Sequence, residues 1–178
     1  MNTISARRGG AIALLGVVCA AGPVAATIQV LPGGANSLQE AHGDWRVACE
    51  LQNGQKACAL SQQIMDKDSR QRILAIELSG GTPNAADGTL ALPFGLALDK
   101  GITLQVDESA AGPALSFRTC LPAGCIVTMA FDAKMIAALK AGKTLRVKAT
   151  GDNAQEVSFG ISLNGFASAL DRTAALTK

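Results

Sequence analysis

Short apolar stretches separated by turn signals run along most of the chain. In several of them apolar and polar residues alternate, as at Ile102, Leu104 and Val106. Alternation with a period of two places successive side chains on opposite faces of a strand. Many short strands joined by turns are typical of an all-β sandwich or barrel. The pattern therefore predicts a single all-β domain over residues 43–178.

One segment departs from the strand pattern and predicts a short connecting helix. Asp132 is placed as its N-cap, and Gly142 stands in the stop position. Between them, apolar residues recur at helical spacing: Met135, Ile136 and Leu139. The C-terminal stretch FASALDRTAALTK either forms a second short helix or frays.

Residues 1–26 have the features of a secretory signal peptide. An arginine pair at 7–8 precedes an apolar, charge-free run at 11–21, and small residues then lead to a cut after Ala26. The run is shorter than the roughly 20 apolar residues that span a bilayer. A twin-arginine signal and a lipid anchor at Cys19 are the alternatives. We expect an exported chain without a transmembrane segment.

The segment after the leader, residues 27–42, mixes Pro, Gly and small polar residues without a period. We interpret it as a mobile N-terminal segment. The chain has 16 Lys plus Arg and 14 Asp plus Glu. Two of the basic residues lie in the leader, so the exported chain has 16 − 2 = 14 of each sign. A nucleic-acid binder needs a basic patch, and the scattered basic residues here predict no nucleic-acid partner.

Four cysteines remain after the leader, and an even count in an exported chain favours disulfides. They are Cys49, Cys58, Cys120 and Cys125. The Asn-Gly pair at 53–54 suits a two-residue type I′ hairpin, which places Cys49 opposite Cys58. The same register places Val47 opposite Leu60 on the cysteines' own face. We expect that face to be the core and Cys49 to pair with Cys58.

The second cysteine pair follows the same logic around the turn LPAG. Pro122 suits the second position of a type I turn and Gly124 the fourth, so Cys120 lies opposite Cys125. We predict that these two cysteines are bonded. Zinc binding and thiol-exchange catalysis are the alternatives. A zinc knuckle has two to four residues between its cysteines, which 120–125 matches and 49–58 does not; exchange catalysis favours C-x-x-C.

Candidate catalytic groups are few. His42 is the only histidine, and we interpret it as a solvated side chain of the mobile segment. The pattern G-x-S-x-G is absent. The stretch DKDS at 66–69 lacks the glycine and the closing glutamate of a calcium loop, which favours a polar turn. We therefore predict no catalytic, cofactor-binding or metal-binding residue, and a protein that is not an enzyme.

Five blocks of the sequence together resemble the invasion-associated locus B family of small exported proteins from Gram-negative bacteria. They are DWRVAC, LPFGLALDKGITLQVD, FRTCLPAGC, LKAGKTLRVKA and VSFGISLNGFASAL. The resemblance implies an immunoglobulin-like β-sandwich, a location in the envelope and, as in the founding members, a part in host-cell invasion. It implies no catalytic residues.

The leading hypothesis is therefore a non-catalytic interaction protein with an unknown protein or envelope partner. We expect it in the periplasm or associated with the outer membrane. A structural or stress-related envelope role without a host is the alternative, and a redox or metal-dependent enzyme is a third. The sequence does not choose between the first two.

Overall fold

The computed structural model describes residues 30–178. The predicted leader, its arginine pair and Cys19 lie outside the described residues. The elements of the described part are β1 (Ser37–His42), β2 (Trp45–Gln52), β3 (Gln55–Met65), β4 (Arg72–Thr82), β5 (Ala85–Leu92), β6 (Ile102–Val106), β7 (Phe117–Leu121), β8 (Gly124–Phe131), β9 (Thr144–Thr150) and β10 (Glu156–Ser162), with the helices α1 (Ala133–Ala141) and α2 (Phe166–Thr177). Two short 3₁₀ turns lie at Pro32–Gly34 and Leu98–Lys100.

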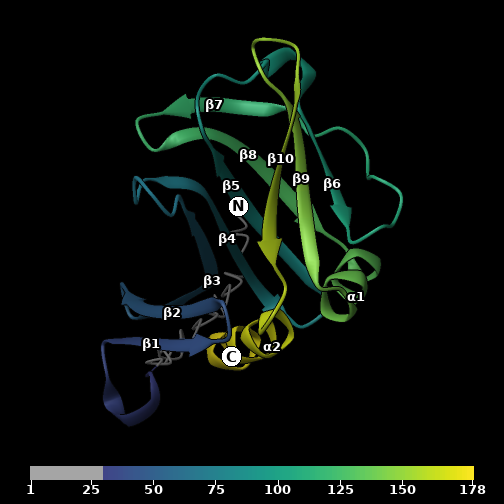
Figure 1. Cartoon of the computed structure of the whole chain (residues 1–178). Helices are drawn as coiled ribbons and strands as arrows, with labels where there is room; N and C mark the ends of the chain where they lie inside the picture. Colours follow the sequence, from purple (N-terminus) through teal and green to yellow (C-terminus); the bar gives the residue numbers. More distant parts are fainter. Residues whose placement is uncertain (1–29) are drawn as a thin grey trace, which may run out of the picture.

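The strands form two antiparallel sheets of unequal size. The large sheet has the order β1-β2-β3-β4-β5-β8-β7, and the small sheet has the order β10-β9-β6. In Figure 1 the large sheet twists from β1 at the lower left to β7 at the top, and the small sheet lies in front of it. The predicted β-sandwich is confirmed, although its sheets are more unequal than the four and three strands of an immunoglobulin constant domain.

The core lies on one face of the large sheet, under the small sheet and α2. Val47, Leu60 and Leu90 are fully buried there, because alternate residues of each strand point inward. Helix α2 lies against β1 to β4. Its Phe166 meets Trp45 edge to face, with ring centroids 5.2 Å apart, an arrangement that aromatic rings favour.

Both helices that the pattern allowed are present. The side chain of Asp132 accepts a hydrogen bond from the backbone N–H of Met135 at 2.8 Å, which makes it the N-cap of α1. Ile136 and Leu139 are the buried residues of α1, which ends before Gly142. The C-terminal segment forms α2 rather than fraying, because its apolar side packs on the large sheet.

The N-terminal segment corrects one prediction. Residues 37–42 were expected to be mobile, but they form β1, which pairs with β2 from Ser37–Glu50 to His42–Trp45. The reason is not local, because β1 is held in place by hydrogen bonds to the backbone of β2 and by polar contacts with α2. Within residues 30–178, no helix is both long enough and apolar enough to cross a membrane.

Candidate binding groove and the polar seam beside it

The first cysteine hairpin has the predicted register. Cys49 lies opposite Cys58 and Val47 opposite Leu60, and the two sulfur atoms are 2.06 Å apart. Asn53 has a φ of 53° and the following glycine is also left-handed, as a type I′ turn requires. Both cysteines are buried, so this disulfide is part of the core.

The second cysteine hairpin also has the predicted pairing, in a different environment. Cys120 lies opposite Cys125, with the sulfur atoms 1.97 Å apart. Cys125 is 2% exposed, whereas Cys120 lies exposed on the edge strand β7. This disulfide therefore closes a turn at the rim of the sheet.

The outer face of the large sheet carries one row of small side chains across five strands. Ala48, Ala59, Ser79, Asp87 and Ala130 are successive register partners on β2, β3, β4, β5 and β8. Each alternates along its strand with buried residues, so the row faces away from the core. Four of the five side chains are alanine or serine, and the row is therefore a trough.

Two hollows of the surface follow this row. The larger, of about 640 Å³, is lined by residues that include Ala48, Ala59, Ser79 and Asp87. The next, of about 510 Å³, also includes Ser79 and Asp87 and extends to Ala130. Because the two hollows share residues, they form one continuous feature, which we call the outer groove.

The larger hollow lies where two hairpins part. The β3–β4 ladder begins only at Ala59–Ser79, whereas β2–β3 continues to its turn at 53–54 and β4–β5 to its turn at 83–84. Cys58 is among the lining residues. Thr177 at the end of α2 lines it too, so the hollow reaches through the gap to the core side of the large sheet, where the first disulfide lies.

Carboxylates dominate the charge of the outer groove. Glu50, Glu77 and Asp87 line it, and all three are exposed. None of the three belongs to an ion pair among the described residues. Lys56 also lines the groove, and its ammonium donates to the main-chain oxygen of Lys178 at 2.7 Å. The groove is thus acidic, with a floor of small residues.

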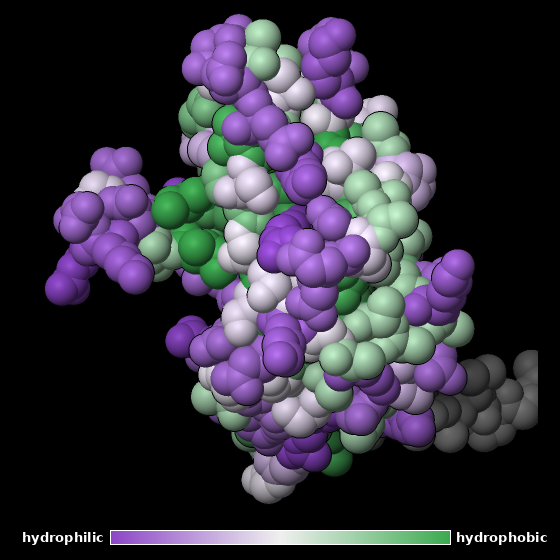
Figure 2. Space-filling view, turned by 45° about the vertical axis from the view of Figure 1, so that its right-hand side comes forward, coloured by the Kyte–Doolittle hydropathy of each residue, from purple (hydrophilic) through white to green (hydrophobic). Residues whose placement is uncertain are grey.

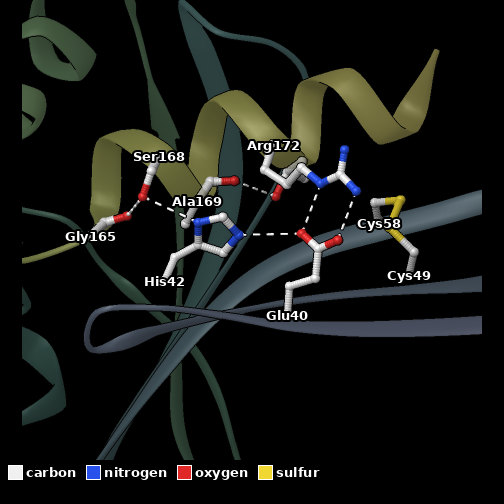
Figure 3. Close-up of polar contacts among 9 residues, drawn as sticks. Glu40, His42, Cys49, Cys58, Gly165, Ser168, Ala169 and Arg172 are labelled. Carbon is white, nitrogen blue, oxygen red and sulfur yellow. Dashed lines mark hydrogen bonds and ion pairs between the residues drawn. A yellow bond between two sulfur atoms is a disulfide. The ribbon is translucent and has the colours of Figure 1, made fainter. Parts of the chain in front are cut away.

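A polar seam joins β1 to α2 (Figure 3). Arg172 donates two hydrogen bonds to Glu40, from Nη2 to Oε1 at 2.7 Å and from Nε to Oε2 at 2.8 Å. His42 Nε2 lies 3.4 Å from Glu40 Oε2, and His42 Nδ1 lies 3.2 Å from Ser168 Oγ. The pKa of Glu40 is lowered to about 2, chiefly by the hydrogen bonds from Arg172 and also by the one to His42, against the effect of burial.

His42 is thus not the solvated residue that we predicted. Its side chain is only 20% exposed, because β1 brings it against α2. The order Ser168–His42–Glu40 invites comparison with a catalytic triad, and the geometry argues against one. In a triad the acid holds Nδ1 and the serine faces Nε2; here the two nitrogens are exchanged.

Two further contacts separate the seam from a nucleophilic site. Ser168 Oγ donates to the main-chain oxygen of Gly165 at 3.0 Å, so its proton is directed at the backbone. Both carboxylate oxygens of Glu40 already bind Arg172. The outer groove is lined by neither Ser168 nor His42. The seam therefore fastens β1 to α2.

The candidate metal segment is a turn. The Asp66 carboxylate accepts hydrogen bonds from the backbone N–H groups of Asp68 and Ser69 and from the Ser69 hydroxyl. The bonds from Ser69 lower the pKa of Asp66. Within residues 30–178 no group of three or more His, Cys, Asp or Glu residues is placed to hold a metal ion.

Exposed apolar side chains are scattered. The large ones are Val30, Met65, Phe94, Leu98 and Leu121. On the side of the molecule in Figure 2, hydrophilic residues cover the projecting parts and hydrophobic areas lie between them. The continuous outer groove, rather than an apolar face, is therefore the candidate binding surface.

These features describe a two-sheet β-sandwich braced by two hairpin disulfides, with a shallow acidic groove along the free face of its large sheet. The sequence matches the family "Invasion associated locus B (IalB) protein" over residues 45–174. The chain belongs to this family.

Named relatives support the assignment along nearly the whole chain. An invasion protein B homolog of Brucella abortus (strain 2308) is 45% identical over 169 residues, which cover 94% of this chain and 97% of the relative. Invasion protein B of Bartonella bacilliformis is 36% identical over 156 residues, or 85% of this chain and 83% of that protein. The crystal structure of invasion associated protein B from Bartonella henselae matches with a TM-score of 0.73 and 37% identity, over 78% of this chain and 96% of that one.

Sequence reasoning found both cysteine pairs and missed the seam and the groove. The seam joins residues 126 and 132 positions apart, namely His42 to Ser168 and Glu40 to Arg172. The alternation of Leu38, Glu40 and His42 on one face of a strand was the only local signal for β1, and two of these three residues are polar. The groove appears only once the registers of five strands are known.

Proposed function

We propose that this protein is a non-catalytic, exported envelope protein that supports contact with host cells or entry into them. The observation that carries the proposal is membership of the invasion-associated locus B family over residues 45–174. Relatives that bear the name invasion protein B share 36–45% of their residues with it over most of the chain. Export and the role toward a host are parts of the proposal.

The two disulfides support an extracytoplasmic location. Structural disulfides persist in oxidising compartments such as the periplasm and are rare in the cytosol. Both pairs here are local, and the first is buried in the core. Together with the leader sequence, this favours the periplasm or the outer membrane surface.

A non-catalytic role is supported by the seam and the groove. The triad-like set at the seam has its nitrogens exchanged and its serine proton committed to the backbone. The outer groove offers carboxylates and a small-residue floor, which suit recognition rather than a nucleophilic reaction. We therefore place the activity in the binding of a partner.

The test is a clean deletion in the source bacterium, complemented with the wild-type gene or with a Ser168→Ala gene. Entry into host cells is counted with and without each complementing copy, and growth in detergent and in acid is measured without a host. We expect reduced entry that both genes restore, and unchanged growth under envelope stress.

Two results would contradict the proposal in different ways. Normal entry together with poor growth in detergent or acid would support a structural envelope role instead. Restoration by the wild-type gene but not by Ser168→Ala, at equal protein levels, would point to chemistry at the seam.

A further inference from the structure

We propose that the outer groove binds an extended peptide segment rich in lysine or arginine, lying across the strands along the row from Ala48 to Ala130. The inference rests on the proposed function, because it names the kind of partner that this exported protein binds.

The length of the row sets the size of the ligand. Five strands are separated by four inter-strand spacings of about 4.8 Å, which gives a trough of about 19 Å. An extended chain advances about 3.3 Å per residue. About six peptide residues therefore span the groove from β2 to β8.

The floor explains why a backbone fits there. Ala48, Ala59 and Ser79 rise little above the sheet, and where the β2–β3 and β4–β5 hairpins part the groove widens into its larger hollow. Gly80 lines the same hollow; a Cβ there would lie 2.7 Å from the main-chain oxygen of Ala85, so the two strands approach too closely at this point for any side chain. The small side chains of the row leave the floor of the groove low enough for a peptide backbone to lie on it.

The charge selects the side chains of that segment. Glu50, Glu77 and Asp87 come from β2, β4 and β5 and face the groove from three strands. No described ion pair neutralises any of the three. Lys56 lies at one end, with its ammonium on the main-chain oxygen of Lys178. Basic side chains at intervals along the peptide therefore meet carboxylates between β2 and β5.

The nearby basic residues of the protein do not cancel the negative charge of the outer groove. Arg46 follows on the same face of β2 and lines the separate hollow around Asp44 and Gln62. It does not line the outer groove. Electrostatic complementarity of this kind favours specificity and fast association more than high affinity. We expect a weak, salt-sensitive complex.

The probe is a synthetic peptide of alternating Lys and Ser, six residues long, compared with a Glu-Ser peptide of equal length. Binding to the purified, oxidised protein is followed by backbone amide shifts and by calorimetry at low and high salt. We expect the Lys-Ser peptide to bind and to shift amides of β2 to β5 and β8. The Glu-Ser peptide should not bind.

Variants locate the contact. Glu77→Gln with Asp87→Asn should weaken binding roughly five- to tenfold, because each exposed ion pair contributes up to about 1 kcal/mol. Ser79→Arg should abolish binding by filling the trough and reversing its charge. Asp152→Asn, in the exposed β9–β10 turn, is the matched control and should bind like the wild type.

Three results would overturn the inference: equal binding of both peptides, amide shifts confined to another surface, or unchanged affinity in Ser79→Arg. All variants change exposed residues, and their fold is checked by circular dichroism. The proposed function fails separately. If Ser79→Arg restores host-cell entry to the deletion strain while it no longer binds the peptide, the groove is wrong and the function stands.

Discussion

The two disulfide hairpins obey the same local rule and lie in opposite surroundings. Cys49–Cys58 joins two neighbouring inner strands of the large sheet and is buried on its core face. Cys120–Cys125 closes a turn at the edge strand β7, with Cys120 exposed. A hairpin turn determines which cysteines meet, whereas the tertiary fold determines how much their disulfide contributes to the free energy of unfolding.

The largest predicted effect is a difference in the unfolding free energy that is lost when each disulfide is removed. Chain entropy alone gives about 2.7 kcal/mol for the first loop and about 2.2 kcal/mol for the second. Replacing the buried pair also leaves a core defect worth about 1–2 kcal/mol. We expect Cys49→Ala with Cys58→Ala to lose about 4 kcal/mol of unfolding free energy, and Cys120→Ala with Cys125→Ala about 2 kcal/mol.

Urea denaturation of the two double variants beside the wild type measures this difference. Each double variant serves as the control for the other, because both remove one hairpin disulfide. Equal losses of unfolding free energy would mean that burial of the first disulfide adds nothing to the chain entropy of closing its loop.

The next effect concerns how the first hairpin is tied to the small sheet. Gln62 on β3 is 5% exposed, and its side chain donates to the main-chain oxygen of Ser162 at 2.9 Å and accepts from its N–H at 3.0 Å. Trp45 Nε1 donates to the same oxygen at 2.8 Å. Gln62→Ala leaves the part-buried backbone N–H of Ser162 without its partner, which costs about 1–3 kcal/mol.

Thermal unfolding checks the Gln62→Ala variant, with Gln63→Ala as the exposed neighbour on the same strand. A loss in Gln62→Ala no larger than that in Gln63→Ala would show that the link between the sheets does not stabilise the fold.

A smaller effect should separate the two disulfides by their reactivity. Thiol–disulfide exchange requires access to a sulfur atom, and Cys120 is the exposed partner of its pair. Brief mild reduction followed by alkylation should label Cys120 and Cys125 at least about tenfold faster than Cys49 and Cys58, which is a barrier difference of about 1.4 kcal/mol. Peptide mapping by mass spectrometry reports both pairs in one sample.

The smallest effect lies at the strand beside the first hairpin. The pKa of Glu40 is lowered to about 2 in the folded protein by Arg172, so its contact contributes stability above the unfolded pKa of about 4.5. That contribution is lost as pH falls from about 5 toward 2. We expect Glu40→Gln to flatten this part of the pH dependence of unfolding. A pH dependence with the same slope as that of the wild type would show that the seam does not stabilise β1.

These comparisons also show what a sequence can predict. The pairing of Cys49 with Cys58 follows from an Asn-Gly turn a few residues away, and α1 follows from Asp132 and its apolar spacing. Both signals are local. Strand β1 has only Leu38 as a large apolar residue, and its order comes from β2 and from Arg172. Such partners are distant in the sequence and leave no local pattern.

The groove illustrates the same limit at the level of the site. Ala48 and Ala130 join one row only because four strand registers align. Along its own strand each is an ordinary small residue on the outward face. The acidic residues Glu50, Glu77 and Asp87 are likewise unremarkable one at a time, and the sheet alone assembles them.

Export and closure of both disulfides come before every other property proposed for this protein. Their sharpest test is the intact mass of the protein recovered from the periplasm, alkylated before any reduction. We predict a chain that begins at Thr27, carries no alkyl group and is four hydrogens lighter than the reduced form, since two disulfides are closed. A chain of all 178 residues, or one alkylated at Cys120 and Cys125, would contradict it.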